Sequence, residues 1–327
     1  MLRVLKVLRG LVMVASGALS ACGPQVGHVV LPGSVARVQP VVLRVQVTEG
    51  SRTVIREVPL EDYVAVAALS EVHPDVADTS IAARMYEVQT VIARTYAVSN
   101  RGRHAKEGFD LCSTTHCQLY QPARLTTSRW AATGRAAAAR TAGEVLWYAD
   151  APARAVFHAD CGGHTSAAGA VWGGTAPAYL DGQRDTGPAG TAHHEWTFEA
   201  RSDALRLALN ADPRTAVGAT LEGVEIAARD DAGRAEKIIL RGTRTFVIRG
   251  ETFRDVVTRR FGVRTLQSTL FTITKARGVF SFAGRGFGHG VGLCQAGALA
   301  RLRAGASPDQ VLGHYFPGTT LRSATNQ

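Results

Sequence analysis

Residues 58–74, VPLEDYVAVAALSEVHP, contain a complete helix signal, and the rest of the chain is interpreted outward from it. Pro59 fits the first turn of a helix, and the two acids just after it complement the exposed backbone N–H groups there. Pro74 pushes the residue before it out of the helical region. The stretch therefore predicts a helix that ends near Val72.

The apolar face of this helix includes a carboxylate. At about 100° per residue, that face carries Leu60, Val64, Ala67 and Glu71. An acid near a helix end usually reaches solvent past the last turn. In a cleft between this helix and a neighbour, burial would instead raise the pKa of Glu71 and let it hold a proton near neutral pH. Periodicity alone favours neither reading.

A second helix is expected over residues 79–99, and it is apolar on most sides. Gln89 shares a face with apolar residues and with Tyr96, while Arg94 has an apolar neighbourhood of its own. Buried polar groups need partners. These side chains therefore either brace the core or line the same cleft as Glu71.

The segment FDLCSTTHCQLY, residues 109–120, crowds metal-ligating side chains onto one loop. It contains Cys112, His116 and Cys117, and His104 lies upstream. Two cysteines and two histidines would complete a tetrahedral zinc site. A disulfide, for example to Cys161, is the alternative in an exported protein. The pattern favours the metal.

The first residues are typical of an export signal. Three cations without an acid precede a short apolar run, and small residues follow. LSAC at 19–22 resembles a bacterial lipobox, which implies a lipoprotein-type signal peptide over 1–21 and lipid attachment to Cys22. Ordinary signal-peptidase cleavage nearby is the alternative. Residues 22–40 are expected to be a tether, and the lipid would anchor the exported protein to the membrane, facing the periplasm or the cell wall.

The formal net charge of +10 favours polyanionic partners. Outside the cytoplasm, cell-wall polymers and lipid headgroups are such partners. The chain has no nucleic-acid motif and no aromatic-basic stripe, so nucleic acid is not expected as a partner.

Residues 284–302, GRGFGHGVGLCQAGALARL, are rich in glycine around His289, so few side chains cover the backbone there before a helix begins. Glycines let a chain approach a strand or a ligand closely. We expect His289 and Gln295 to offer hydrogen bonds in a cleft. Cys294 is interpreted as a small buried hydrophobic residue.

The remaining pattern predicts an α+β fold. Alternating residues on either side of Glu49-Gly50 indicate a β-hairpin, and the alanine-rich stretch within 123–142 indicates an exposed helix. Residues 196–275 alternate helix-like and strand-like stretches, unlike the helix-rich part before them, and are expected to be a smaller α+β subdomain. It would be inserted into a mixed core of buried helices and antiparallel strands formed by 41–195 and 276–327.

Six motifs in order resemble the stage II sporulation protein D (SpoIID) / LytB family, over about residues 41–321. They are VPLEDYVAVAALSEV, EVQTVIARTYAV, FDLCSTTHCQLY, FHADCGGHTS with VWGG, GRGFGHGVGLCQAGA, and HYFPGTTL. The resemblance implies a peptidoglycan lytic transglycosylase, which cuts between N-acetylmuramic acid and N-acetylglucosamine and leaves a 1,6-anhydro end. It also makes the core catalytic, with Glu71 as the catalytic acid.

The resemblance assigns further roles. The cysteine loop would hold a structural zinc, with His104 as our choice for the fourth ligand and Cys161 in reserve. The residues expected to line the glycan groove are Gln89, Arg94, Tyr96, Gln118, Tyr120, His289 and Gln295. Cys294 departs from the family, whose members commonly have serine there.

One glutamate suffices for this chemistry. A protonated carboxylic acid gives its proton to the leaving oxygen, and the resulting base activates the nucleophile. In a transglycosylase the nucleophile is the sugar's own 6-hydroxyl, so no second carboxylate is needed to hold water.

Two other functions compete with this one. Some relatives are described as enhancers of wall amidases, so the chain could bind peptidoglycan and recruit another cell-wall hydrolase without cutting. A zinc amidase would use the metal to activate water. However, catalytic zinc sites keep an open position and usually have fewer thiolates. The sequence does not identify the physiological process, sporulation included.

Overall fold

The described part of the chain begins with a β-hairpin. The structure is a computed structural model that describes residues 41–185 and 194–323. Strands β1 (Val42–Glu49) and β2 (Arg52–Pro59) pair antiparallel in full register. Gly50 takes a positive φ of 60° in the turn between them, which glycine adopts without strain. The predicted hairpin is confirmed.

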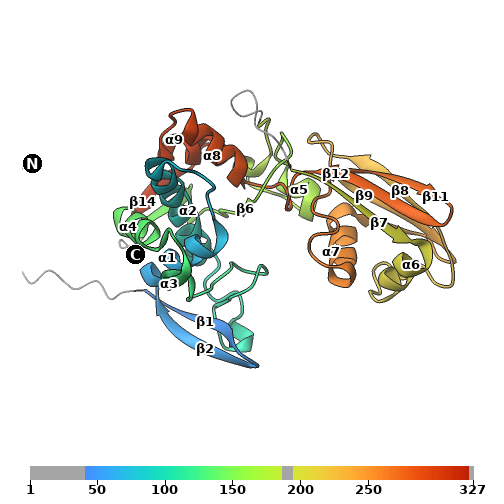
Figure 1. The fold of residues 1–327 in the computed structure, drawn as a ribbon, viewed down its shortest axis with the longest axis horizontal. Helices are drawn as coiled ribbons and strands as arrows, with labels where there is room; N and C mark the ends of the chain where they lie inside the picture. The colour runs from blue at the N-terminus through green and yellow to red at the C-terminus, as the bar shows by residue number, and fades with distance from the viewer. Residues whose placement is uncertain (1–40, 186–193, 324–327) are drawn as a thin grey trace, which may run out of the picture. The chain divides into compact units, whose positions relative to one another are not determined.

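Two buried helices follow the hairpin (Figure 1). Helix α1 (Leu60–Glu71) starts directly after Pro59, and α2 (Thr79–Ser99) starts after Asp78, whose carboxylate accepts from the Ser80 N–H. Both helices lie where the sequence predicts them. The expected single apolar face of α1 is too narrow a description, because all of its residues from Tyr63 to Ser70 are buried.

The alanine-rich stretch 123–142 differs from its prediction. It forms two helices, α3 (Arg124–Thr127) and α4 (Ala131–Arg140), and α4 packs against both α1 and α2. A Cβ at Gly134 would lie 2.8 Å from the Leu69 side chain, so the contact requires glycine. The expectation of an exposed helix is therefore wrong for the inner face of α4. Small alanines there permit close packing, which composition alone does not distinguish from solvent exposure.

Short strands and turns complete the first part of the described chain. β3 pairs parallel with β1. β4 lies between β5 and β14 (Thr320–Ser323), which comes from the end of the described chain. The further elements up to residue 185 are η1 (Ala105–Glu107), β3 (Leu111–Cys112), β4 (Glu144–Tyr148), β5 (Ala151–Pro152), β6 (Phe157–His158), α5 (Ala168–Trp172) and η2 (Ala178–Leu180).

The next part builds two three-stranded antiparallel sheets around a separate apolar cluster, with strand orders β10-β9-β8 and β11-β12-β7. Phe253, Phe271 and Phe282 lie in its centre. Its elements are β7 (Glu195–Arg201), α6 (Ser202–Asn210), β8 (Leu221–Arg229), β9 (Ala235–Gly242), β10 (Phe246–Arg249), α7 (Gly250–Phe261), β11 (Phe271–Ala276) and β12 (Val279–Arg285).

The end of this part lies beyond the boundary expected at residue 275. Strand β12, assigned from the sequence to the returning segment, is the central strand of the β11-β12-β7 sheet. Phe280 and Phe282 of β12 belong to the same apolar cluster. Moreover, all described residues belong to one compact unit. Strand pairing, rather than a change of composition, thus sets where this part ends.

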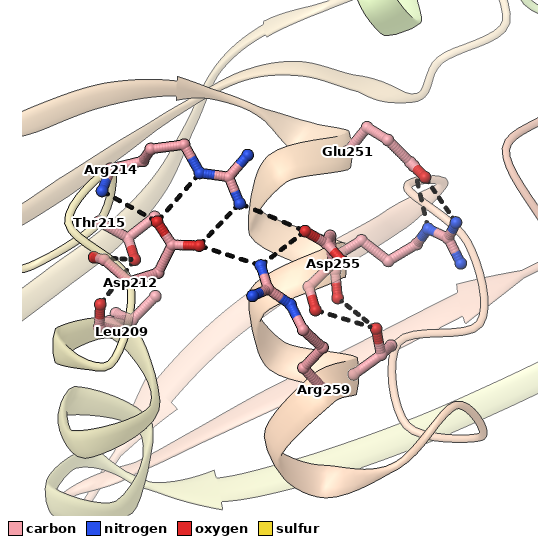
Figure 2. Close-up of polar contacts among 9 residues, drawn as sticks. Leu209, Asp212, Arg214, Thr215, Glu251, Asp255 and Arg259 are labelled. Atoms are coloured by element: carbon pink, nitrogen blue, oxygen red, sulfur yellow. Dashed lines mark hydrogen bonds and ion pairs between the residues drawn. The ribbon is translucent and has the colours of Figure 1, made fainter. Parts of the chain in front are cut away.

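An ion-pair network connects α6 to α7 (Figure 2). Asp212, in the turn after α6, binds Arg214 at 2.7 Å and Arg259 at 2.9 Å. Asp255 of α7 also contacts both arginines, at 3.3 Å and 2.7 Å. The arginines are more than half exposed, so this network joins the helices at the surface.

The chain then returns to α2. Strand β13 pairs parallel with β6, and α8 and α9 pack on each other and on α2. Large apolar side chains from these elements complete the cluster around α2. The last elements are β13 (Leu293–Cys294), α8 (Gln295–Arg303), α9 (Pro308–Tyr315) and β14 (Thr320–Ser323). A mixed α+β fold is confirmed. Among the described residues, no helix is both long and apolar enough to cross a bilayer.

Candidate active site and metal centre

Glu71 is the last residue of α1, and its carboxyl group meets the cysteine-bearing segment. Its Oε1 accepts a hydrogen bond from the Leu119 backbone N–H at 2.6 Å. The next residue, Val72, is already extended, so the helix ends with the glutamate side chain facing this loop. The residue is neither fully exposed nor fully buried.

Local hydrogen bonds bring the loop to Glu71. β3 pairs with β1, and the Ser113 N–H continues this pairing to the Gln46 carbonyl. The Tyr120 N–H returns to the Ser113 carbonyl and closes the loop at 3.1 Å. The Gln121 N–H then donates to Ser70 Oγ at 3.0 Å. The donor at Leu119 is thus fixed on both sides.

The surroundings of Glu71 favour its protonated form. Burial raises the pKa of Glu71 to about 7, and the Leu119 N–H only partly opposes this rise. No other carboxylate and no cation of the described residues contributes to the pKa. Of its two oxygens, only Oε1 accepts a hydrogen bond from a described residue, and the residue as a whole is partly exposed. Glu71 therefore combines a proton near neutral pH with partial exposure.

The first residue of α8 approaches the same helix end. Gln295 Nε2 lies 3.4 Å from the Glu71 carbonyl oxygen and 3.3 Å from Gln89 Oε1. Gln295 is partly exposed, whereas Gln89 is completely buried in α2. Of the pair, only Gln295 can therefore meet a ligand, and Gln89 positions it.

Three aromatic and amide side chains connect α1 to the cysteine-bearing loop. Tyr63 stacks on Tyr120 with ring centroids 5.2 Å apart, and its hydroxyl donates to Gln118 Oε1 at 3.2 Å. Gln118 is completely buried, so its predicted place in a glycan groove is corrected here: it braces the loop from inside. Tyr120 and Tyr96 keep only a small exposed fraction, and the Tyr96 hydroxyl contacts Arg103.

Arg94 does not line the groove either. Its side chain is completely buried and binds both carboxylate oxygens of Glu61, at 2.9 and 2.5 Å. Backbone carbonyls of Ala138 and Glu144 accept its remaining protons. The prediction of a substrate contact is wrong, because the guanidinium is used in joining α1, α2 and α4.

His104, Cys112, His116 and Cys117 come together beside this loop. One donor atom of each lies within 4.8 Å of the others. Cys117 Sγ is 3.3 Å from His104 Nε2, and His116 Nδ1 is 3.7 and 3.8 Å from the two sulfurs. Both cysteines are free thiols, so the alternative of a disulfide does not occur here.

The chemistry of this donor set suits zinc. Two sulfurs and two imidazole nitrogens are the usual ligands of a closed tetrahedral site. His104 Nδ1 is 2.5 Å from the Glu107 carboxylate, which orients the ring and leaves Nε2 directed at Cys117. The Leu119 donor to Glu71 follows Cys117 by two residues. A metal here would hold the loop that contacts Glu71.

Known proteins resemble this chain over the same segments. Residues 48–148, which include Glu71 and the cysteine loop, match the family described as Stage II sporulation protein. The chain is 25% identical to the stage II sporulation protein D of Bacillus subtilis (strain 168), over 83% of this chain and 76% of that protein. Over residues 48–148 the chain is thus similar to the SpoIID family. Residues 175–292 match a domain of unknown function, DUF8618.

Two further relatives are covered by this chain to different extents. One is named amidase enhancer, also from Bacillus subtilis (strain 168); it is 27% identical over 78% of this chain, but the match covers only 40% of that protein. The chain thus spans less than half the length of that relative. An uncharacterized protein of Brachyspira hyodysenteriae is 29% identical over 82% of this chain.

His289, by contrast, has its contacts elsewhere than at Glu71. Its ring packs against Trp172 and His158, with centroids 5.0 and 5.5 Å apart, and its Nδ1 accepts from the Val291 N–H. Burial lowers the pKa of His289 to about 4, so it is neutral at physiological pH. None of these partners belongs to α1 or to the cysteine loop. The expected hydrogen bond to Glu71 comes from Gln295 alone, and to its carbonyl oxygen.

The glycines around His289 serve packing. A Cβ at Gly292 would lie 2.2 Å from the Val156 carbonyl oxygen, and one at Gly290 would lie 2.4 Å from Arg234 Nε. Both glycines have positive φ. These glycines therefore accommodate the segment before β6 and a buried arginine, which corrects the expectation that they bring the chain close to the cleft beside Glu71.

Sequence reasoning missed three groups of this site. The Leu119 N–H, the Ser70 hydroxyl and the Tyr63 ring all hold the loop against α1. No sequence signal identifies a backbone donor, because every residue except proline has one. The predictions for residues 1–40, including lipid attachment at Cys22, lie outside the described residues.

Proposed function

We propose that this chain is a peptidoglycan lytic transglycosylase with Glu71 as general acid and then general base. The observation that supports the proposal is the environment of Glu71: burial raises its pKa to about 7, Leu119 holds one oxygen, and the residue is partly exposed. General acids in glycosidases need this combination.

The reaction uses one carboxyl group twice. Glu71 Oε2 gives its proton to the glycosidic oxygen as the bond to C1 of N-acetylmuramic acid breaks. The resulting carboxylate takes the proton of that sugar's 6-hydroxyl, whose oxygen bonds to C1. Glu71 ends protonated, no water is consumed, and the product carries a 1,6-anhydro ring. The Leu119 N–H stays on Oε1 and stabilises the carboxylate between the two steps.

The proposed route differs from hydrolysis because it needs no second carboxylate beside Glu71. Hydrolytic glycosidases use paired carboxyl groups, one of which activates water or forms a covalent intermediate. Among the described residues, no other acid contributes to the pKa of Glu71. Intramolecular attack by the sugar needs only the one base.

Gln295 is the proposed contact to the glycan beside Glu71. It is partly exposed, and its amide is held by Gln89 and the Glu71 carbonyl. Tyr120 and Tyr96 keep only 9% and 7% of their surface exposed. We retain these three as proposed groove residues.

Zinc is proposed at His104, Cys112, His116 and Cys117 as a structural ion. A site with four protein ligands has no open position for water, which argues against a zinc amidase. The metal would fix the loop and, through Leu119, the carboxyl group of Glu71. Removal by a chelator is expected to lower the melting temperature and to leave the identity of the products unchanged, as measured by calorimetry and product analysis of the same sample.

The deciding experiment is digestion of purified glycan strands, with and without stem peptides, followed by mass spectrometry. The wild type should release anhydro-ended fragments, and Glu71→Gln should not. Asp62→Asn is the matched control, since Asp62 lies on the same helix and is exposed. Hydrated reducing ends instead of anhydro ends would reject the transglycosylase and retain a glycosidase.

A second candidate function is enhancement of a cell-wall amidase without cleavage, as the name of one relative suggests. In that case the strands would bind but stay intact. The rate of a purified amidase on peptidoglycan would rise equally with the wild type and with Glu71→Gln. An increase that requires Glu71 would contradict this alternative.

Export and lipid attachment at Cys22 are proposed from the sequence. Metabolic labelling with a radioactive fatty acid should mark the wild type, and Cys22→Ser should remain unlabelled. Labelling of both forms would show that the lipid is elsewhere.

A further inference from the structure

A second group of soft ligands lies apart from the proposed zinc loop. His158 is the last residue of β6, and Cys161 lies three residues later. Cys294 is the last residue of β13, which pairs with β6. A ring nitrogen of His158 and the two sulfurs all lie within 4.8 Å of one another. All three residues are buried, and both cysteines are free thiols.

The histidine has one nitrogen ready to bind a metal. His158 Nδ1 lies 3.1 Å from the Val291 carbonyl oxygen, which can only accept, so the ring proton is on Nδ1. Nε2 therefore carries a lone pair. It is buried and has no hydrogen-bond partner among the described residues. Metal-ligating histidines usually donate their other N–H to such a carbonyl.

The sulfurs are surrounded by donors. The Cys161 N–H points to Cys294 Sγ at 3.2 Å, and the Gly297 N–H points to the same sulfur at 3.3 Å. The Gly163 N–H points to Cys161 Sγ, also at 3.3 Å. Cys294 is in addition the N-cap of α8, where the helix dipole favours negative charge. Backbone donors of this kind stabilise thiolates over thiols.

We propose that His158, Cys161 and Cys294 bind a second zinc ion. Two thiols each lose a proton to solvent as Zn²⁺ binds, so the ion and two thiolates form a neutral group in the buried site. The Cys161 thiol donates to Asp185 Oδ2 at 3.4 Å, and Asp185 lies outside the three-residue cluster.

This ion would tie β6, the turn after it and the start of α8 into one unit. Gln295, the neighbour of Cys294, contacts Glu71 and Gln89. A disulfide between Cys161 and Cys294 would also link the strands, but it would leave Nε2 of His158 without a partner. The unpaired nitrogen and the N–H donors to sulfur therefore favour the metal.

The test separates the two metal sites. The full chain is purified, loaded with Zn²⁺ and analysed by elemental mass spectrometry, beside a variant carrying Cys112→Ser and Cys117→Ser. We expect two zinc ions per wild-type chain and one in the variant. Adding Cys294→Ser to the variant should remove the remaining ion. In the same background, Co²⁺ should give the visible bands of a tetrahedral thiolate site, and His158→Gln should weaken its affinity at least about tenfold.

Cysteine alkylation with peptide mapping resolves the outcomes that overturn the proposal. If the wild type holds at most one zinc ion and Cys161 and Cys294 react only after reduction, the pair is a disulfide. If they react after unfolding without reductant and no ion is bound in the Cys112→Ser, Cys117→Ser variant, they are plain buried thiols. These two results come from wild-type protein and a variant outside the site, so a folding failure of Cys294→Ser does not affect them.

Discussion

Glu71 and Asp185 are both acids removed from bulk water, but the fold treats them in opposite ways. Asp185 is completely buried; the Tyr315 hydroxyl binds it at 2.6 Å and Arg301 at 2.9 Å. Burial alone would raise its pKa, but His314, Tyr315 and Arg301 outweigh burial and hold the pKa well below its usual range. Glu71 receives one backbone N–H and no cation, so burial prevails and its pKa rises to about 7.

The difference teaches which acid stabilises the fold and which is free to react. A buried carboxylate with a cation and a hydroxyl is a fixed anion that joins elements. Asp185 in this way connects the segment that follows η2 to α8 and α9. An acid left without such partners keeps its proton, and its burial costs stability instead of adding to it. The comparison can be tested at each of its two members and at a third acid, Asp212, whose cation partners are exposed.

The largest expected effect is on catalysis at Glu71. On the proposed function, Glu71→Gln removes the transferable proton and should lower turnover on glycan strands roughly 10²–10⁴-fold, the usual contribution of a general acid. Its folding stability should not fall, since glutamine resembles the protonated acid that the site already favours. Release of soluble fragments and urea denaturation measure the two effects. A large loss of both would mean that Glu71 is structural.

The sequence predicts some of this arrangement and not the rest. Helix ends are local, so Pro59 and Pro74 suffice to place α1. The ionisation of Glu71, however, depends on Leu119, which is 48 positions away. Arg94 could equally have met a glycan or Glu61, because helical periodicity shows that it is buried but not what pairs with it.

The same limit applies to the glycine-rich segment. His289 and Gln295 are six residues apart and were expected in one cleft, yet the turns between them direct His289 to Trp172 and Gln295 to Glu71. Only backbone conformation decides this, since glycine permits either direction.

The next largest effect is on stability at Asp185. Asp185→Asn keeps the shape but leaves Arg301 and a buried site without their anion, which should cost roughly 3 kcal/mol or more of unfolding free energy. Asp181→Asn is the matched control, because Asp181 lies nearby in sequence and is exposed. Urea denaturation at neutral pH measures both. If the two variants lose equal stability, the Asp185 contacts contribute nothing beyond the surface.

A smaller effect appears in the pH dependence of stability. The pKa of Glu71 is raised on folding from 4.5 to about 7, so the folded state binds the extra proton. Its favourable contribution is complete below pH 4.5 and is lost as the pH rises through 7, by at most about 3 kcal/mol. Asp185, with a lowered pKa, contributes above its unfolded value of 3.8 and loses this only as the pH falls. Between pH 4.5 and 7 the wild type should therefore lose stability relative to Glu71→Gln. Parallel stability curves would place the pKa of Glu71 at its ordinary value.

The smallest effect is expected at Asp212, where an acid has two arginine partners but these lie in solvent (Figure 2). Asp212→Asn keeps an oxygen to accept from the Arg214 N–H, so it removes only the charge. Because both arginines are more than half exposed, water screens the network and the loss should be about 1 kcal/mol or less. It should also shrink in high salt, whereas the loss from Asp185→Asn should not. Urea denaturation at low and high ionic strength compares the two. A large, salt-independent loss at Asp212 would mean that the number of ion-pair partners, and not their burial, determines what an acid contributes to this fold.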